Sequence, residues 1–115
     1  MPPHLEPITV VIVAESTDVR ERLAAFAAGL PGVEVVAQAT NAHEAIEAVR
    51  MRHPRAMIVD VSSSGIDGPD VLRRIKGADP APVLIALIDQ ADRQFRTACL
   101  DAGARILLDK SLLLA

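Results

Sequence analysis

Five short stretches of the chain are almost entirely apolar, and segments of helical periodicity separate them. Runs without polar alternation are typical of parallel strands that are covered on both faces. The second stretch alternates more, with Glu34 between Val33 and Val35, which favours a place at the edge of a sheet. The five predicted strands are Ile8–Val13, Val33–Ala39, Ala56–Val61, Pro82–Ile88 and Arg105–Leu108.

Helices are predicted between these strands because apolar residues return there every three or four positions. Ser16 or Thr17 is placed to cap the first helix, and Asn41 with Glu44 forms a capping pair for the second. Asp89 is expected to cap the fourth. The expected buried stripes are Val19, Leu23, Phe26 and Leu30; Ala42, Ala45, Ile46 and Val49; Val71, Leu72 and Ile75; and Phe95, Ala98, Cys99 and Ala102.

The order of elements is strand and helix repeated four times, followed by a last strand. Strands that alternate with helices at this spacing form a parallel sheet with right-handed crossovers. The sequence therefore predicts one α/β domain with a doubly wound parallel sheet of five strands over residues 8–115. Residues 1–7 contain three prolines, which oppose helix and sheet alike, and we expect them to form a disordered leader.

The third apolar stretch ends on a carboxylate, Asp60, and a turn rich in Ser and Gly follows it. In an open α/β sheet, side chains just past the carboxyl end of a strand lie where ligands bind. A carboxylate at this place is suited to nucleophilic attack on a phosphoryl group. The alternative, an aspartate that only holds the turn, stays open from this stretch alone.

Composition narrows the classes of function further. Half of the 115 residues are hydrophobic, so a sizeable core is predicted without metal or disulfide. The net charge of −3 and the aromatic content of 2% argue against nucleic-acid binding. The single cysteine, Cys99, is expected to be a buried apolar residue in a reducing compartment. With neither a signal peptide nor a membrane-spanning run in the sequence, we expect a soluble cytoplasmic protein.

From Ile8 to Ser111 the sequence resembles the receiver domain of bacterial two-component response regulators. The order and spacing of several short motifs carry this resemblance. They are Val13-Ala14-Glu15, Ile58-Val59-Asp60, Gly65-Ile66-Asp67-Gly68, Leu72-Arg73-Arg74-Ile75-Lys76, Ala102-Gly103-Ala104 and Lys110. The resemblance implies a flavodoxin-like sheet with strand order 2-1-3-4-5.

The resemblance also implies a role for individual residues. Asp60 corresponds to the phosphoryl acceptor, and Lys110 to the lysine that contacts the phosphoryl oxygens. Glu15 and the backbone carbonyl of Ser62, together with Asp60, correspond to the Mg²⁺ ligands. A cation and a lysine offset the anionic charge that builds up during such an attack.

Four positions depart from the pattern of the family. Ala14 replaces one of two adjacent acids, which predicts weak or absent Mg²⁺ binding because the attraction scales with the number of carboxylates. Leu87 stands in place of the switch hydroxyl, Leu107 in place of the switch aromatic, and Ser64 in place of a proline. We expect slow or absent phosphorylation with a small conformational response.

Receiver domains normally close with a fifth helix, whereas only Ser111–Ala115 follow Lys110 here. We therefore expect the last helix to be missing or truncated and one half of a sheet face to be bare. A parallel sheet does not tolerate a bare apolar face. The expectation is a homodimer or other partner on that face, and the alternative is a chain that continues beyond Ala115.

The sequence thus predicts a non-enzymatic receiver domain that a sensor histidine kinase phosphorylates on Asp60. The alternative is a pseudo-receiver, in which the same fold acts as a protein-interaction module without phosphorylation. An aspartate-dependent phosphatase is disfavoured because Ser62 occupies the place of the second catalytic aspartate. A flavin-binding module is disfavoured because the loop at 14–18 is acidic and lacks glycine.

Overall fold

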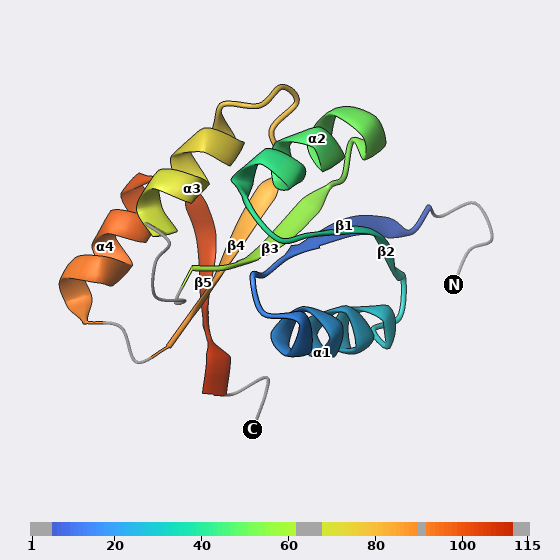
Figure 1. Ribbon diagram of the computed structural model, residues 1–115, viewed down its shortest axis with the longest axis horizontal. Coiled ribbons are helices and arrows are strands. Elements are labelled where there is room, and N and C mark those ends of the chain that lie inside the picture. Colours follow the sequence, from blue (N-terminus) through green and yellow to red (C-terminus); the bar gives the residue numbers. More distant parts are fainter. Residues whose placement is uncertain (1–5, 62–67, 90–91, 112–115) are drawn as a thin grey trace.

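The computed structural model describes residues 6–61, 68–89 and 92–111. Strands and helices alternate along these residues. The predicted order of elements is confirmed (Figure 1). Most strand ends lie within one residue of their predicted places. The elements are β1 (Ile8–Val13), α1 (Thr17–Ala28), β2 (Val33–Ala39), α2 (Ala42–Arg52), β3 (Ala56–Asp60), α3 (Gly68–Lys76), β4 (Val83–Ile88), α4 (Arg93–Asp101) and β5 (Ala104–Asp109).

The five strands form one parallel sheet in the order β2-β1-β3-β4-β5, as the sequence predicts. The alternating strand β2 lies at one edge and β5 at the other. Helix α1 covers one face of the sheet, while α2, α3 and α4 cover the opposite face (Figure 1). This arrangement is the flavodoxin-like receiver fold, and it brings the carboxyl ends of β1, β3 and β5 to the same end of the sheet.

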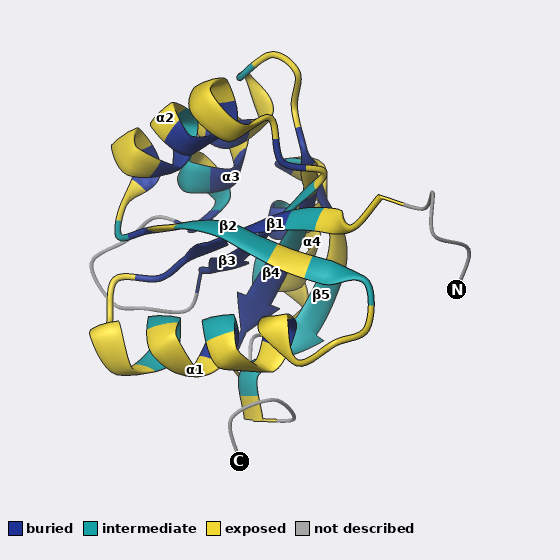
Figure 2. Cartoon of the chain, turned by 90° about the vertical axis from the view of Figure 1, so that its right-hand side faces the viewer, coloured by how far each residue is buried: buried dark blue, intermediate teal, exposed yellow. Residues whose placement is uncertain are grey.

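Successive side chains of each central strand point to opposite faces of the sheet. In β3, Met57 and Val59 pack on the side of α2, α3 and α4, whereas Ile58 packs on the side of α1. Figure 2 shows β1, β3 and β4 largely buried and the outer surfaces of the helices exposed. Aliphatic side chains fill the space between sheet and helices, and the partly buried ring of Phe95 packs against them on the side of α2, α3 and α4.

Side-chain caps fix where three of the helices begin. The Oγ of Ser16 accepts from the amide of Val19 at 3.3 Å, so Ser16 rather than Thr17 caps α1. The Oδ1 of Asn41 accepts from the amide of Glu44 at 2.8 Å, which confirms the predicted cap of α2. The carboxylate of Glu44 reaches back to the amide and hydroxyl of Thr40, both at 2.8 Å.

The predicted cap of α4 is wrong. Asp92, not Asp89, is the N-terminal cap, because its Oδ1 accepts from the amide of Phe95 at 2.8 Å. The sequence offered two aspartates three residues apart. The helix begins at Arg93, and a side-chain oxygen reaches only the second or third amide after the cap.

The predicted buried stripe of α1 is only partly correct. Leu23 is buried, and Ala27 is buried in place of Phe26 and Leu30, which are 43% and 42% exposed. Spacings of seven and four residues would place Phe26 and Leu30 on one side of a continuous helix with Val19. Helix α1 lies against β1 and β2, and no other described helix covers that face beside it. Val19 is partly buried and packs against the core cluster, whereas Leu30 lies beyond the end of the helix at Ala28. The sheet therefore covers the side of α1 that carries Leu23 and Ala27 and leaves Phe26 at its margin.

Candidate functional site

Asp60 is the one buried charged residue of the described chain, with 4% of its surface exposed. It closes β3, and the ladder to β4 pairs it with Leu87. Burying a carboxylate without a partner is costly, so such a group is normally paired or hydrogen-bonded. The position of Asp60 is therefore set by the strand, and its charge requires a nearby donor.

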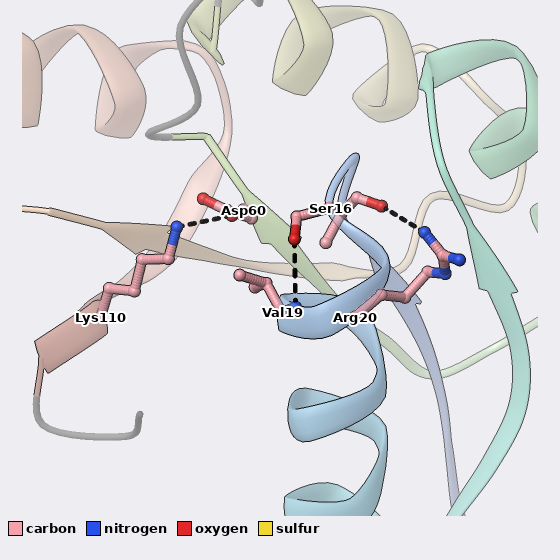
Figure 3. A network of polar contacts seen from close by, with 6 residues as sticks. Ser16, Val19, Arg20, Asp60 and Lys110 are labelled. Carbon is pink, nitrogen blue, oxygen red and sulfur yellow. Dashed lines mark hydrogen bonds and ion pairs between the residues drawn. The ribbon is translucent and has the colours of Figure 1, made fainter. Parts of the chain in front are cut away.

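Lys110 supplies that donor. Its Nζ donates to Oδ2 of Asp60 at 2.9 Å, and the lysine side chain itself is largely buried (Figure 3). Lys110 follows the end of β5, and β4 lies between β5 and β3. Neighbouring strands are about 4.8 Å apart, so the lysine must reach across the end of β4 to meet the carboxylate. Two residues fifty positions apart in the sequence thus form one charged pair.

The strand between these two residues presents an apolar side chain. Leu87 is fully buried, and its carbonyl accepts the amide of Val61 at 3.1 Å. Leu107, on β5, packs against the core on the side of α2, α3 and α4. Neither leucine can donate a hydrogen bond through its side chain. The pair of Asp60 and Lys110 thus has no hydroxyl beside it from these two positions.

The turn between β1 and α1 approaches the site from the other side. Ala14 is buried, whereas Glu15 is exposed. The guanidinium of Arg20 donates to the carbonyl oxygens of Ala14 and Glu15 at 3.1 and 3.4 Å and to the Oγ1 of Thr17 at 3.3 Å. Figure 3 shows Arg20 pointing to this backbone and away from Asp60. Arg20 thus holds the turn that carries Glu15, a role that the sequence analysis missed.

Two further acids, Asp109 and Asp89, lie at the carboxyl ends of β5 and β4. Asp109 accepts from the hydroxyl and amide of Ser111 at 2.8 and 2.9 Å. These hydrogen bonds, with a smaller contribution from Arg96, hold the pKa of the Asp109 carboxyl below its ordinary value. Asp89 is exposed at the end of β4. Ser62, whose carbonyl the resemblance assigns to the metal, lies outside the described residues.

Receiver domains as a class bind Mg²⁺ in an acidic pocket. Among the residues that the structure describes, no group of three or more His, Cys, Asp and Glu side chains is placed to hold a metal ion. Mg²⁺ requires oxygen ligands in near-octahedral positions and uses one or two carboxylates with several waters. Here Ala14 provides no carboxylate, Glu15 is exposed, and Asp60 is already paired with Lys110. Of the assigned ligands, the described residues thus include two carboxylates, the buried Asp60 and the exposed Glu15.

The parallel sheet, the buried aspartate at the end of β3 and the lysine after β5 define a class of signalling domain. The sequence matches the response regulator receiver domain family over residues 10–114. The chain belongs to this family, which confirms the resemblance.

The chain is also similar to parts of larger proteins. It is 37% identical over 79 residues to protein-glutamate methylesterase/protein-glutamine glutaminase 5 of Anaeromyxobacter dehalogenans, covering 69% of this chain and 22% of that protein. It is 30% identical over 112 residues to the protein of the same name and number from Myxococcus xanthus, covering 96% of this chain and 32% of that protein. The chain thus spans a third or less of these two relatives.

Solved structures show the same fold. The receiver domain of the response regulator NarL from Mycobacterium tuberculosis superposes with a TM-score of 0.81 at 21% identity, over 92% of this chain and 86% of that one. The response regulator domain of Thermotoga maritima CheB gives 0.80 at 22% identity, over 91% of this chain and 79% of that one. No helix of the described residues is long and apolar enough to cross a membrane.

Proposed function

We propose that this receiver domain accepts a phosphoryl group on Asp60, with Lys110 as the cation that contacts the phosphoryl oxygens. The observation that carries the proposal is the 2.9 Å contact between Lys110 Nζ and Asp60 Oδ2 at the end of a buried strand. The ammonium lies where negative charge would build up during the transfer. A cation fixed there in advance favours the transition state more than the ground state.

The transfer itself is a substitution at phosphorus. An oxygen of Asp60 forms a bond to the phosphorus of the donor and yields an acyl phosphate. The bond from phosphorus to the donor nitrogen of a phosphohistidine breaks at the same centre, and its electron pair leaves with the imidazole. The imidazole takes up a proton from solvent. This chain supplies the nucleophile and the cation, and the partner, a sensor histidine kinase, supplies the donor.

We assign the residues on the opposite side of the pocket a weaker contribution. Glu15, Asp60 and the carbonyl of Ser62 are the candidate Mg²⁺ ligands, and the loss of an acid at Ala14 lowers the affinity for the ion. Acceptance at a given Mg²⁺ concentration is therefore slow. The domain has no enzymatic activity of its own in this proposal, and it acts in the cytoplasm.

Intact mass after incubation with phosphoramidate tests the proposal. Phosphoramidate carries a P–N bond, so it imitates the histidine donor without requiring the kinase. The expected result is a gain of one phosphoryl group that is lost in Asp60→Asn and greatly slowed in Lys110→Met. No gain, with another receiver domain labelled in the same experiment, would contradict it.

The pseudo-receiver is the second candidate function. Leu87 and Leu107 favour it, since neither offers a hydroxyl or aromatic hydroxyl to a phosphoryl group. In that case the domain binds its partner with the same affinity whether or not Asp60 carries a charge. Equal binding of the wild-type chain and Asp60→Asn to a kinase partner would support the pseudo-receiver.

We also propose that a second copy of the chain covers the β4–β5 face, by which we mean Ile85, Ile106 and Leu108 on the side of α1. Ile85 pairs with Ile106 in register, and Ile106 is 45% exposed although it belongs to a parallel sheet. Sedimentation of the wild-type chain should show dimers, and Ile106→Arg should dissociate them. Met51→Arg, which changes an exposed residue of α2, is the control and should leave the dimers intact. A monomer at high concentration would contradict the proposal, and suppression of dimers by a longer chain would assign the face to a fifth helix.

A further inference from the structure

Val61 and Gly68, which flank residues 62–67 in the sequence, lie in contact with each other. Val61 comes directly after Asp60, and Gly68 is the first residue of α3. A Cβ on Gly68 would lie 2.7 Å from the Cβ of Val61 and 2.9 Å from its carbonyl oxygen. Real Cβ atoms do not approach other atoms this closely, so only glycine allows this contact. The residue after Asp60 is therefore in direct contact with the start of α3.

An aromatic ring from α4 lies against the same point. The Cζ of Phe95 would be 3.3 Å from a Cβ on Gly68, and the ring packs against the core cluster that contains Val61. Phe95 is also the residue whose amide the cap Asp92 accepts at 2.8 Å, so the ring is attached to the first turn of α4. The position of the Phe95 ring is thus fixed by the cap of α4 and by packing against the core.

This contact links the strand that carries Asp60 to a helix that is remote from it in sequence. The alternative links are weak here, because Leu87 and Leu107 present only apolar side chains. Close-packed side chains move together, since the interior has little free volume to absorb a displacement. A small shift of Val61 would therefore press directly on Gly68 and, through it, on the Phe95 ring.

We propose that Phe95 couples the charge state of Asp60 to α4 through Gly68, which lies between Val61 and the Phe95 ring. The inference rests on the proposed function in one respect, since phosphorylation would be the natural change of charge at Asp60. When the interaction between Asp60 and Lys110 changes, Val61 shifts with the end of β3, and the ring transmits this shift to the first turn of α4.

A double-mutant cycle measured by amide hydrogen exchange tests the coupling without any phosphoryl donor. Asp60→Asn removes the charge and should change the exchange rates of the α4 amides from Thr97 to Leu100 by about threefold or more. In the Phe95→Ala background the same change should be less than about 1.5-fold. Phe26→Ala, the other phenylalanine of the chain, is the matched control and should leave the response of α4 intact.

Two further measurements keep a loss of stability apart from a loss of coupling. The amide of Val11, in the core of β1, reports global opening, so its exchange should change equally in Phe95→Ala with and without Asp60→Asn. Phe95→Leu keeps an apolar side chain of similar reach and should restore part of the response.

The inference is overturned if α4 responds to Asp60→Asn equally with and without the Phe95 ring. It is also overturned if α4 does not respond to Asp60→Asn in the wild-type background. Intact mass with phosphoramidate is a separate measurement. A failure to accept the phosphoryl group would contradict the proposed function and leave the exchange cycle fully informative about Phe95.

Discussion

The two sides of the candidate site keep their charged groups in place to different degrees. On one side, Asp60 is buried at the end of β3 and paired with Lys110 at 2.9 Å. On the other side, Ala14 has no charge, Glu15 is exposed, and Arg20 binds backbone carbonyls. The comparison teaches that the buried charged pair of Asp60 and Lys110 is fully formed on one side of the site. The turn on the other side carries Glu15 exposed, and Arg20 holds it by hydrogen bonds to two carbonyl oxygens and to the hydroxyl of Thr17.

The largest effect on stability is expected for the pair of Asp60 and Lys110. Lys110→Met removes the ammonium and leaves the Asp60 carboxylate buried without this partner, which should lower the free energy of unfolding by about 3 kcal/mol. Chemical denaturation measures this loss. Adding Asp60→Asn removes the buried charge that has lost this partner, so the double variant should be more stable than Lys110→Met alone. A double variant that is less stable would contradict the account of the pair.

Restoring the missing acid should have the next largest effect. Ala14→Asp places a second carboxylate on the turn beside Asp60, and each added carboxylate strengthens attraction for a divalent ion. We expect Mg²⁺ affinity to rise about tenfold, measured by calorimetric titration. Ala14→Asn has nearly the same shape without the charge and should leave the affinity unchanged. An equal rise in both variants would show that charge is not what this side lacks.

Loss of Arg20 should loosen the β1–α1 turn. Arg20→Ala removes three hydrogen bonds to the turn and should cost about 1–2 kcal/mol of stability. Arg22→Ala, on the same helix, breaks only an exposed ion pair with Asp18 and should cost less than about 0.5 kcal/mol. Thermal unfolding of both variants makes the comparison. Equal losses would show that Arg20 does not hold the turn.

The smallest effect concerns a region away from both sides. Hydrogen bonds from the amide and hydroxyl of Thr40 lower the pKa of Glu44 below its ordinary value of 4.5. Because the pKa in the folded state is lowered, Glu44 contributes stability above pH 4.5 that is lost as the pH falls through the lowered value. Unfolding of the wild type and Glu44→Gln should differ slightly at pH 6 and converge in strong acid. A difference that grows in acid would contradict the sign.

The fold was predictable from the sequence because its signals are local and repeated. Apolar runs such as Ile8–Val13 predict strands without knowledge of their neighbours, and Asn41 with Glu44 marks a helix start by itself. The same local reasoning failed where two candidates compete. Asp89 and Asp92 carry the same chemistry, and only the position of the first turn of α4 separates them.

The resemblance predicted roles for single residues, and the structure adds the contacts that these residues make. Asp60 and Lys110 were found through the resemblance, and the fold confirms that the two side chains meet. The role of Arg20 was not found, because a guanidinium that binds carbonyl oxygens leaves no pattern in the sequence. The exposure of Phe26 was missed for a related reason. Helical spacing predicts which residues share a side of α1, and it does not show how much of that side the sheet covers.

The position of a transferred phosphoryl group tests the central claim most directly. The chain is labelled with phosphoramidate and then treated with borohydride, which reduces an aspartyl phosphate to homoserine, and peptide fragmentation locates the changed residue. The account predicts homoserine at position 60 and none in a Lys110→Met chain labelled for the same short time. Homoserine at another aspartate, or equal labelling without Lys110, would contradict it.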